Sequence, residues 1–313
     1  MPIPELSRLG FGAAPIGNLF SALDDDTARA AVDEAWNQGI RYFDTAPHYG
    51  LGLSERRLGA ALRGRPRDEF TLSTKVGRIL EPVTGPVHGK DTEGFDVPAA
   101  FTRRWDFSAA GIRRSIESSL DRLGLDRIDI AYLHDPDDFV EQALTEAYPA
   151  LEQLRSEGVV RAIGVGMNQS AVPTRFLTET DIDVVLLAGR YTLLDQSGAD
   201  DLLPAALERG VKIVLGGVFN SGLLANPHAA ATYNYVPAPA ALVERAQAME
   251  SVCADHGVPL RAAALHFALA HPAVTSALIG IRDAAQASDC AAMAGVTVPE
   301  TLWQDLRAHG LLG

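Results

Sequence analysis

Four side chains that suit proton transfer follow short apolar runs in this 313-residue sequence: Asp44, Tyr49, Lys75 and His134. A tyrosine hydroxyl has an ordinary pKa of about 10, which is too high for easy proton exchange at neutral pH. A lysine ammonium close to the hydroxyl favours the phenolate and lowers that pKa. An aspartate can hold the ammonium in place, and a histidine can position a substrate oxygen by hydrogen bonding. The set therefore suits general acid–base chemistry.

Each of these residues also has a common structural role when it is considered alone. Asp44 can cap the end of a strand, Tyr49 can be a half-buried aromatic, and His134 can be a hydrogen-bonded core histidine. Lys75 is one of only three lysines and interrupts an apolar pattern, although it too can pair with a structural carboxylate. Because all four structural roles would have to hold together, we favour the functional interpretation.

The segments that must position these residues are short β-rich runs separated by amphipathic helical patterns. Most of the runs are continuously apolar, as is typical of strands buried on both faces. We expect strands at 8–15, 41–46, 70–76, 128–134, 160–166, 184–189, 212–217 and 276–281. We expect helices at 25–39, 108–124 and 142–158, among others, with Pro149 kinking the third or marking a late start.

Eight strands alternating with helices over about 300 residues predict an α/β fold, a single (β/α)8 TIM barrel spanning 1–313. The alternative is a doubly wound sheet with a second domain, but nothing in the sequence resembles an interdomain linker. A barrel places the carboxyl ends of its strands on one face, where such enzymes carry their chemistry. The four residues above would then meet at that face.

The connection from about residue 77 to 107 is unusually long and lacks a strong periodicity. It contains several prolines and aromatic residues. Loops of this length are usually either functional or disordered. Because this segment follows the third strand, we expect it to lie over the C-terminal mouth of the barrel.

Composition and motif content exclude several classes of protein. The net charge of −13 argues against a broad nucleic-acid-binding face. Two cysteines without CxxC or Cys/His spacing argue against a disulfide framework and a structural zinc site, so we expect no metal. No signal peptide or membrane span is visible, which favours a cytoplasmic protein with a small-molecule substrate and no membrane partner. The GxGxxG, GxxxxGK[ST], HExxH and GxSxG motifs are absent, as is a tyrosine followed four residues later by lysine.

The residues resemble those of the aldo-keto reductases, which are (β/α)8 enzymes that use nicotinamide cofactors. The resemblance covers essentially the whole chain. The motifs that carry it are FDTAPHYGLGLSERRLGAAL (43–62), STKVG (73–77), RLGLDRIDIAYLHDPD (122–137), GVVRAIGVGMNQ (158–169), LLAGRYTLLDQ (186–196), NSGLL (220–224) and IGIRDAAQ (279–286).

The resemblance implies a role for each matching residue. Tyr49 would be the general acid/base, Lys75 and Asp44 would tune it, and His134 would orient the substrate oxygen. A cofactor lying across the barrel mouth would contact the loops after strands five to eight. The residues implied for it are Asn168, Gly216, Gly217, Val218, Phe219, Asn220, Gly280, Arg282 and Gln286.

Some positions depart from the family pattern. Ala188 stands where a glutamine often faces the carboxamide, and Gly216 stands where a tyrosine often stacks on the nicotinamide. NADP-dependent relatives commonly offer a lysine, a serine and an arginine to the 2′-phosphate, whereas this chain has Gly280, Ile281 and Gln286. Without a cationic cluster for the phosphate, we expect NAD rather than NADP.

Within the family, the motifs are most similar to those of bacterial aldose 1-dehydrogenases of the L-fucose and D-threo-aldose type. The implied reaction is oxidation of a sugar's anomeric hydroxyl to the lactone. Pyridoxal 4-dehydrogenases, which act on a hemiacetal of the same local chemistry, and NADPH aldehyde reductases are alternatives. A nicotinamide-sensing regulatory subunit is a further alternative, which the intact catalytic set disfavours. Candidate pocket residues are Phe11, His48, Trp105 and Phe219.

Overall fold

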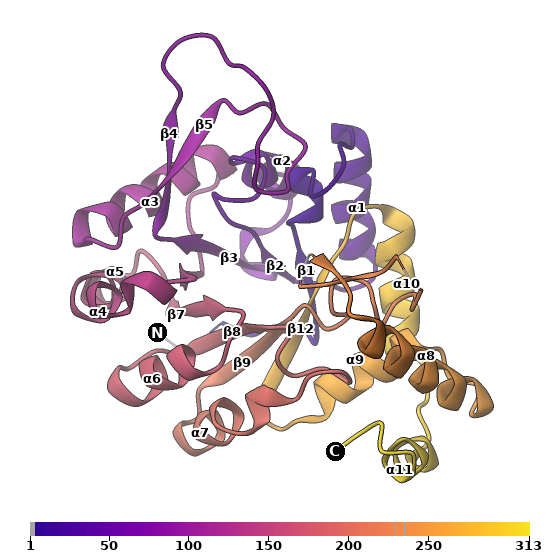
Figure 1. Cartoon of the computed structure of the whole chain (residues 1–313). Coiled ribbons are helices and arrows are strands. Elements are labelled where there is room, and N and C mark those ends of the chain that lie inside the picture. Colours follow the sequence, from indigo (N-terminus) through magenta and orange to yellow (C-terminus); the bar gives the residue numbers. More distant parts are fainter. Residues whose placement is uncertain (1–3, 229, 235) are drawn as a thin grey trace.

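The computed structural model describes residues 4–228, 230–234 and 236–313, and its central feature is a closed barrel of eight parallel strands (Figure 1). The order around the barrel is β1-β12-β9-β8-β7-β6-β3-β2, so the doubly wound alternative is wrong and the barrel prediction is confirmed. The strands are β1 Leu9–Gly12, β2 Tyr42–Asp44, β3 Thr71–Val76, β6 Ile130–His134, β7 Ala162–Met167, β8 Val184–Ala188, β9 Lys212–Gly216 and β12 Val274–Gly280.

Helices surround the barrel (Figure 1). The helices that alternate with the barrel strands are α1 Asp25–Asn37, α2 Leu53–Leu62, α3 Ala109–Leu123, α5 Tyr148–Ser156, α6 Ala171–Glu179, α7 Leu202–Arg209, α9 Leu260–Ala270 and α10 Ala284–Ala294. Two additional helices, α8 Ala240–Asp255 and α11 Glu300–Ala308, pack with α9 around a second apolar core. The short elements are α4 Val140–Gln142, a π-helical turn Ala143–Ala147, the 3₁₀ turns Pro15–Gly17, Arg67–Glu69, Asp137–Phe139 and Ser197–Ala199, and the strand pair β10 Thr232–Tyr233 and β11 Val236–Pro237.

Local sequence signals set the ends of the helices. Ser108 accepts a hydrogen bond from the Gly111 N–H and caps α3, and Gly124 ends it in a left-handed conformation with φ 61°. Helix α5 begins at Tyr148 with Pro149 in its first turn, after the π-helical turn. Helical residues thus run without a break from Val140 to Ser156, so a late start is wrong, and the irregularity predicted at Pro149 takes the form of the π-helical turn just before it.

The strands alternate between an interior face and a helix-facing side, as the two-residue period of a strand requires. The barrel interior contains Tyr42, Ile130, Tyr132, Ala162, Val184, Leu186, Val214 and Leu278. The neighbouring positions, such as Phe11 and Phe43, pack outward against the helices. Residues two positions apart on one strand consequently share a face, and this rule decides which side chains can reach the site.

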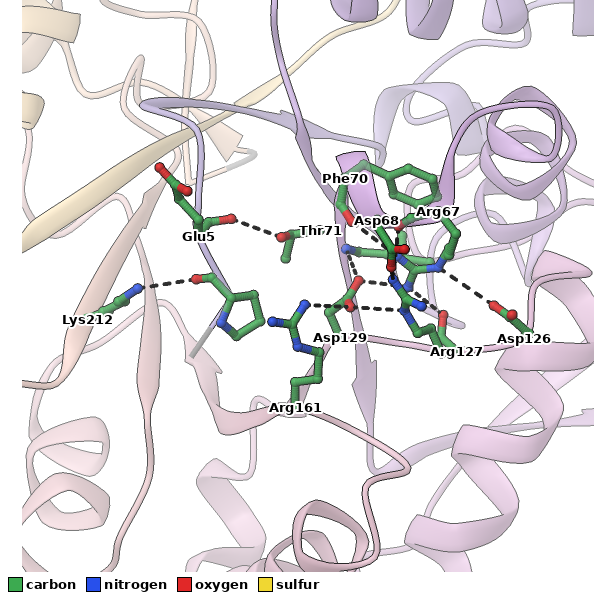
Figure 2. A network of polar contacts seen from close by, with 12 residues as sticks. Glu5, Arg67, Asp68, Phe70, Thr71, Asp126, Arg127, Asp129, Arg161 and Lys212 are labelled. Atoms are coloured by element: carbon green, nitrogen blue, oxygen red, sulfur yellow. Dashed lines mark hydrogen bonds and ion pairs between the residues drawn. The ribbon is translucent and has the colours of Figure 1, made fainter. Parts of the chain in front are cut away.

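A network of ion pairs and hydrogen bonds lies at the N-terminal end of the barrel (Figure 2). The fully buried Asp129 accepts hydrogen bonds from the Leu72 N–H at 2.8 Å and from Arg67 at 2.7 Å. Lys212 donates to the Pro4 carbonyl at 3.2 Å. These contacts join the starts of several strands at the end opposite Asp44, so they stabilise the barrel without contributing to the chemistry.

The long 77–107 connection contains a two-stranded antiparallel ribbon that the sequence pattern did not predict. Strand β4, Arg78–Pro82, pairs with β5, Phe101–Trp105, and the segment between them folds back toward the barrel mouth (Figure 1). Backbone hydrogen bonds join this segment to the β1–α1 loop, from the Phe20 N–H to the Gly94 carbonyl at 2.8 Å. Among the described helices, none is long and apolar enough to cross a membrane.

Candidate active site

Lys75 and Asp44 form a buried ion pair at the C-terminal end of the barrel. The Lys75 Nζ lies 2.5 Å from Asp44 Oδ2 and donates to the Thr45 carbonyl at 3.1 Å. The side chains are 3% and 1% exposed. Burial opposes the charged form of Lys75, but Asp44 and Tyr49 raise its pKa above the ordinary value of lysine. The ammonium is thus held in its charged form.

Tyr49 lies over this ammonium. The Lys75 Nζ is 4.7 Å from the centroid of the Tyr49 ring, and the two side chains are hydrogen-bonded. The backbone that carries Tyr49 packs directly on Gly17, because a Cβ built on Gly50 would lie 2.1 Å from the Gly17 carbonyl oxygen. Gly50 also has φ 61°, so a glycine is needed there for both reasons. The close packing fixes the position of the tyrosine relative to Lys75.

A hydrogen-bonded chain beneath Asp44 was missed by sequence reasoning. The Ser73 hydroxyl donates to Asp44 Oδ1 at 2.6 Å. Since that uses its only proton, Ser73 accepts from the Tyr42 hydroxyl at 3.0 Å, and Tyr42 accepts from Tyr132 at 3.1 Å. Burial raises the pKa of both tyrosines, so they remain neutral donors. The chain therefore orients the carboxylate that holds Lys75.

Sequence position contained a signal for this chain. Tyr42, Ser73 and Tyr132 each stand two residues before a predicted catalytic residue on the same strand. Because a strand repeats every two residues, side chains at this spacing share the interior face. Polar residues at these positions are the signal that could have identified the chain.

His134 completes the group at the end of β6. Its ring lies 6.0 Å from the Tyr49 ring and 5.7 Å from the His48 ring, measured between centroids. Burial, followed by the positive charges of Arg78 and Lys75, lowers the pKa of His134 well below its ordinary value. Its Nδ1 is buried without a hydrogen-bond partner in the described part of the chain. The imidazole is therefore neutral and has polar capacity left for a ligand.

A cavity of about 380 Å³ opens in front of these residues. That volume is within the usual range of small-molecule sites. Its walls mix aliphatic and aromatic side chains with carboxylate, imidazole, phenol and ammonium groups. The lining residues are Ala14, Leu19, Phe20, His48, Tyr49, Lys75, Glu93, Gly94, Phe95, His134, Asp135, Gly166, Met167, Asn168, Leu186 and Ala188.

Three of the four candidate pocket residues, Phe11, Trp105 and Phe219, do not line this cavity. Phe11 is fully buried and packs on Phe43 at 5.9 Å between ring centroids. It faces the helices because its neighbours Gly10 and Gly12 occupy the interior positions of β1. Trp105 lies on β5, and the Cζ atom of Arg78 lies over its ring, 4.3 Å from the ring centroid. Trp105 is absent from the described lining of the cavity. His48 does line the cavity, with its ring 5.2 Å from that of Phe95.

The segments implied for a cofactor lie at the same end of the barrel. Asn168 follows β7, is exposed, and lines the cavity. Gly216 ends β9 and pairs with Ala188, the last residue of the neighbouring strand β8. Two small residues therefore lie side by side beneath the mouth of the barrel. Gly217, Val218, Phe219 and Asn220 follow in a turn, outside the cavity lining.

Asn220 supports the fit of a nicotinamide dinucleotide to this turn. Its side chain is buried, and neither its amide nitrogen nor its amide oxygen has a hydrogen-bond partner among the described residues. An unpaired buried polar group typically costs about 1–3 kcal/mol. A ligand rich in donors and acceptors would remove that cost, and the adjacent glycines allow it to approach the backbone closely.

The end of β12, the loop after it and the start of α10 contribute Gly280, Arg282 and Gln286 respectively. The Arg282 guanidinium donates to the Ser21 hydroxyl at 2.8 Å and to the Ala22 carbonyl at 3.0 Å. Gln286 accepts from the Arg282 N–H at 2.9 Å, so its side chain folds back on the backbone. A Cβ on Gly280 would lie 3.2 Å from the Pro15 ring. These side chains tie the β12 loop to the β1 loop.

The closed barrel and the Asp44–Lys75–Tyr49–His134 arrangement define an oxidoreductase of the aldo-keto reductase class. The sequence pattern of the Aldo/keto reductase family matches residues 8–310, and the chain belongs to that family. Enzymes of the family use nicotinamide cofactors.

Two curated relatives and one solved structure are similar to this chain over nearly its whole length. The chain is 50% identical to the D-threo-aldose 1-dehydrogenase of Pseudomonas sp. over 98% of its own length and 95% of the relative's. It is 37% identical to the pyridoxal 4-dehydrogenase of Microbacterium luteolum, with the same coverage of both chains. Among solved structures, the holo form of an aldo-keto reductase from Bacillus halodurans superposes with a TM-score of 0.74 at 28% identity, covering 98% of this chain and 93% of that one.

Proposed function

We propose that this protein is an NAD-dependent dehydrogenase that oxidises the anomeric hydroxyl of an aldose, of the L-fucose or D-threo-aldose type, to the lactone. The observation that carries the proposal is the contact of Tyr49 with the buried Lys75–Asp44 pair on the wall of the cavity. The 50% identity to a D-threo-aldose 1-dehydrogenase over nearly the whole of both chains supports the substrate class. In this proposal residues 1–313 form one catalytic domain.

Tyr49 acts as the general base in oxidation. Its phenolate takes the proton of the anomeric hydroxyl, and the charged Lys75 stabilises that phenolate. Asp44 and the Thr45 carbonyl hold the ammonium in position. When bound, the nicotinamide ring supplies the acceptor for the hydride that leaves the anomeric carbon. In the reverse direction Tyr49 returns the proton to the carbonyl oxygen.

His134 orients the substrate oxygen. Because its pKa lies well below the ordinary value, the ring is a neutral imidazole at physiological pH. A neutral imidazole has one N–H donor and one nitrogen acceptor, so it can donate a hydrogen bond to the reacting oxygen without adding a second positive charge. The positive charge then stays on Lys75, next to the tyrosine that must lose its proton.

The preference for NAD rests on the β12 loop. In an NADP site, cationic side chains are free to bind the 2′-phosphate. Here the Arg282 guanidinium is hydrogen-bonded to Ser21 and Ala22, and Gln286 is neutral and bound to the backbone. Asp283 caps α10 at the same point and adds a negative charge that would repel a phosphate. We therefore assign Asn168, the 216–220 turn, Gly280, Arg282 and Gln286 to an NAD site.

Pyridoxal oxidation is the second candidate, because a pyridoxal 4-dehydrogenase is 37% identical over nearly the whole chain. Pyridoxal in its hemiacetal form presents a cyclic carbon that carries both hydrogen and hydroxyl. Tyr49 and His134 would treat this carbon as they treat an anomeric carbon. The catalytic residues therefore do not separate the two substrates.

The test is to follow NADH formation at pH 8–9 with L-fucose, L-galactose, D-arabinose and pyridoxal, and to repeat each assay with NADP. We expect the aldoses to be oxidised with NAD in preference to NADP. Faster oxidation of pyridoxal would favour the second candidate. If no panel member is oxidised while simple aldehydes are reduced with NADPH, the protein is a general aldehyde reductase. Cofactor binding without any turnover would indicate a sensing subunit.

A further inference from the structure

Two carboxylates in the cavity wall have no part in the proposed proton transfer. Asp135 follows His134 directly, and Glu93 projects from the segment between β4 and β5. Carboxylates are costly to place in a partly buried site unless they are paired or bind something. An arginine pairs with each of the two and offsets this cost. The side of each carboxylate that faces the cavity is left for a ligand to contact.

The backbone is held in an uncommon conformation at Asp135. Its φ is 43°, in the left-handed region that only a few per cent of non-glycine residues adopt. Its N–H donates to the Gly166 carbonyl at 3.1 Å, which anchors this conformation to the neighbouring strand β7. Backbone strain of this kind persists only where the surrounding structure imposes it. Here it accompanies a carboxyl group that lines the cavity.

Only one oxygen of the Asp135 carboxyl group, Oδ2, makes polar contacts with the described residues. Oδ2 pairs with Arg78 and lies 3.6 Å from His134 Nε2. In the described part of the chain, these are the recorded contacts of the carboxyl, and none involves Oδ1. Burial raises the pKa of Asp135 above its ordinary value, and the positive charge of Arg78 offsets part of that rise. An ionised carboxylate only accepts hydrogen bonds, so Oδ1 is available to a ligand that donates one.

Glu93 is placed by a buried ion pair on the ribbon. Arg103 of β5 binds both oxygens of Asp91, at 2.6 and 2.9 Å, and both side chains are less than a tenth exposed. The same guanidinium lies 3.3 Å from Glu93 Oε1 and donates to the His48 carbonyl at 3.1 Å. The Glu93 side chain remains half exposed. Arg103 therefore fixes the segment against the barrel while leaving Glu93 accessible to a ligand in the cavity.

We propose that Glu93 and Asp135 bind the hydroxyl groups that the substrate carries away from its reacting carbon, and so select a neutral polyhydroxylated substrate. This inference rests on the proposed aldose oxidation. Hydroxyl-to-carboxylate hydrogen bonds are short and about twice as strong as neutral ones. The apolar wall around Phe95 suits the C–H face of a sugar ring. The same two charges repel substrates that carry a carboxylate or a phosphate.

The test compares Glu93→Gln and Asp135→Asn with wild type on one aldose and on each of its monodeoxy analogues. The wild type is expected to lose about tenfold in kcat/KM when the hydroxyl that a carboxylate binds is deleted. In the matching variant the parent aldose should lose about tenfold, mainly through KM, and the deoxy analogue should lose little more. L-Galactose and L-fucose already form one such pair, because L-fucose is 6-deoxy-L-galactose.

Matched controls separate this role from a general effect of charge removal. Glu81→Gln removes a carboxylate that pairs with Arg104 on the same ribbon, outside the described cavity lining. Asp138→Asn removes an exposed carboxylate three residues after Asp135. Both variants should keep the wild-type kcat/KM and the wild-type deoxy penalties. Asparagine tolerates the left-handed backbone, so Asp135→Asn is expected to keep the local conformation.

Three results would overturn the inference. Unchanged deoxy penalties in both variants would show that neither carboxylate binds a substrate hydroxyl. An equal fall in kcat for parent and deoxy substrates in Asp135→Asn would assign that residue to the orientation of His134 instead. A wild-type enzyme that oxidises no aldose would contradict the proposed function and this inference with it, whereas the first two outcomes leave the proposed function intact.

Discussion

Lys75 and Asp44 are joined by an ion pair of 2.5 Å between Nζ and Oδ2, and both side chains are almost completely buried. Removing one partner of such a pair leaves an uncompensated charge, which typically costs about 3–5 kcal/mol. The pair also fixes the ammonium beside Tyr49, because the Lys75 Nζ lies 4.7 Å from the centroid of the Tyr49 ring. The same contact links the stability of the barrel mouth to the proposed chemistry.

Asp44→Asn should therefore lower both stability and activity. We expect the free energy of unfolding to fall by about 3 kcal/mol, measured by urea denaturation. The Lys75 ammonium would be held less firmly and would stabilise the phenolate less. The pH at which oxidation reaches half its maximum should consequently rise. The control is Asp25→Asn, which breaks the exposed pair with Arg57 and should change stability by less than about 1 kcal/mol. An unshifted pH profile in Asp44→Asn would contradict the tuning role.

Ser73→Ala tests the hydrogen-bonded chain beneath Asp44. It removes the 2.6 Å donor to Oδ1 and leaves Tyr42 without its acceptor. We expect kcat to fall about tenfold with KM nearly unchanged, because the ion pair loses its orientation while the cavity keeps its shape. Ser115→Ala on α3 removes a comparably buried hydroxyl outside the barrel and should leave kcat unchanged. Equal kinetics in the two variants would refute the positioning role of Ser73.

His48 should make stability depend on pH. Burial, followed by the charges of Arg78, Arg103 and Lys75, lowers the pKa of His48 to about 2. Below its ordinary pKa of about 6.5, the unfolded chain binds a proton that the folded chain does not. Stability therefore falls as the pH falls, by up to about 1.4 kcal/mol per pH unit for this one group.

His48→Gln should remove that contribution and make the pH dependence of stability shallower between about pH 6 and pH 4. Urea denaturation at each pH gives the slope. His88→Gln, which changes an exposed histidine of the β4–β5 segment, serves as the control and should leave the slope at the wild-type value. A slope in His48→Gln as steep as in the wild type would show that His48 titrates normally in the folded protein.

Gln286→Arg should increase the use of NADP. An arginine at the start of α10 adds a cation where Arg282 is already engaged with Ser21, and it can bind a 2′-phosphate. We expect the ratio of kcat/KM with NADP to that with NAD to rise at least about tenfold. Gln286→Met removes the same side-chain hydrogen bond without adding charge and should leave the ratio unchanged. If this ratio is unchanged in Gln286→Arg, the 2′-phosphate of NADP does not bind near residue 286, and the assignment of the cofactor site to this loop is wrong.

Much of the barrel could be predicted from the sequence because its strands are buried on both faces. Each of the eight predicted strand segments contains a barrel strand, and Ser108 and Gly124 marked the ends of α3 correctly. The ribbon of β4 and β5 was missed because its sequence mixes charged residues with prolines. It is stabilised by pairing between two segments about 20 residues apart, which no local pattern reports.

The positions of the candidate site residues were predictable where residue type and strand position agreed. Lys75 was informative because a lysine in an apolar strand needs a partner, and Asp44 on the adjacent strand is that partner. Phe11 was placed on the wrong face because the alternation along β1 was not followed through its glycines. Asp135 could not be singled out, since its role depends on a left-handed backbone and on Arg78 from another element.

The central claim is that Tyr49 transfers the proton, and Tyr49→Phe tests it most directly. The measurement is the rate of NADH formation with the preferred aldose, together with NAD binding followed by protein fluorescence. We predict a fall in kcat of about 1,000-fold or more, because general acid–base catalysis contributes typically 10²–10⁴-fold, with NAD affinity nearly unchanged. Substantial turnover by Tyr49→Phe would contradict the role assigned to Tyr49 and, with it, the mechanism proposed for this site.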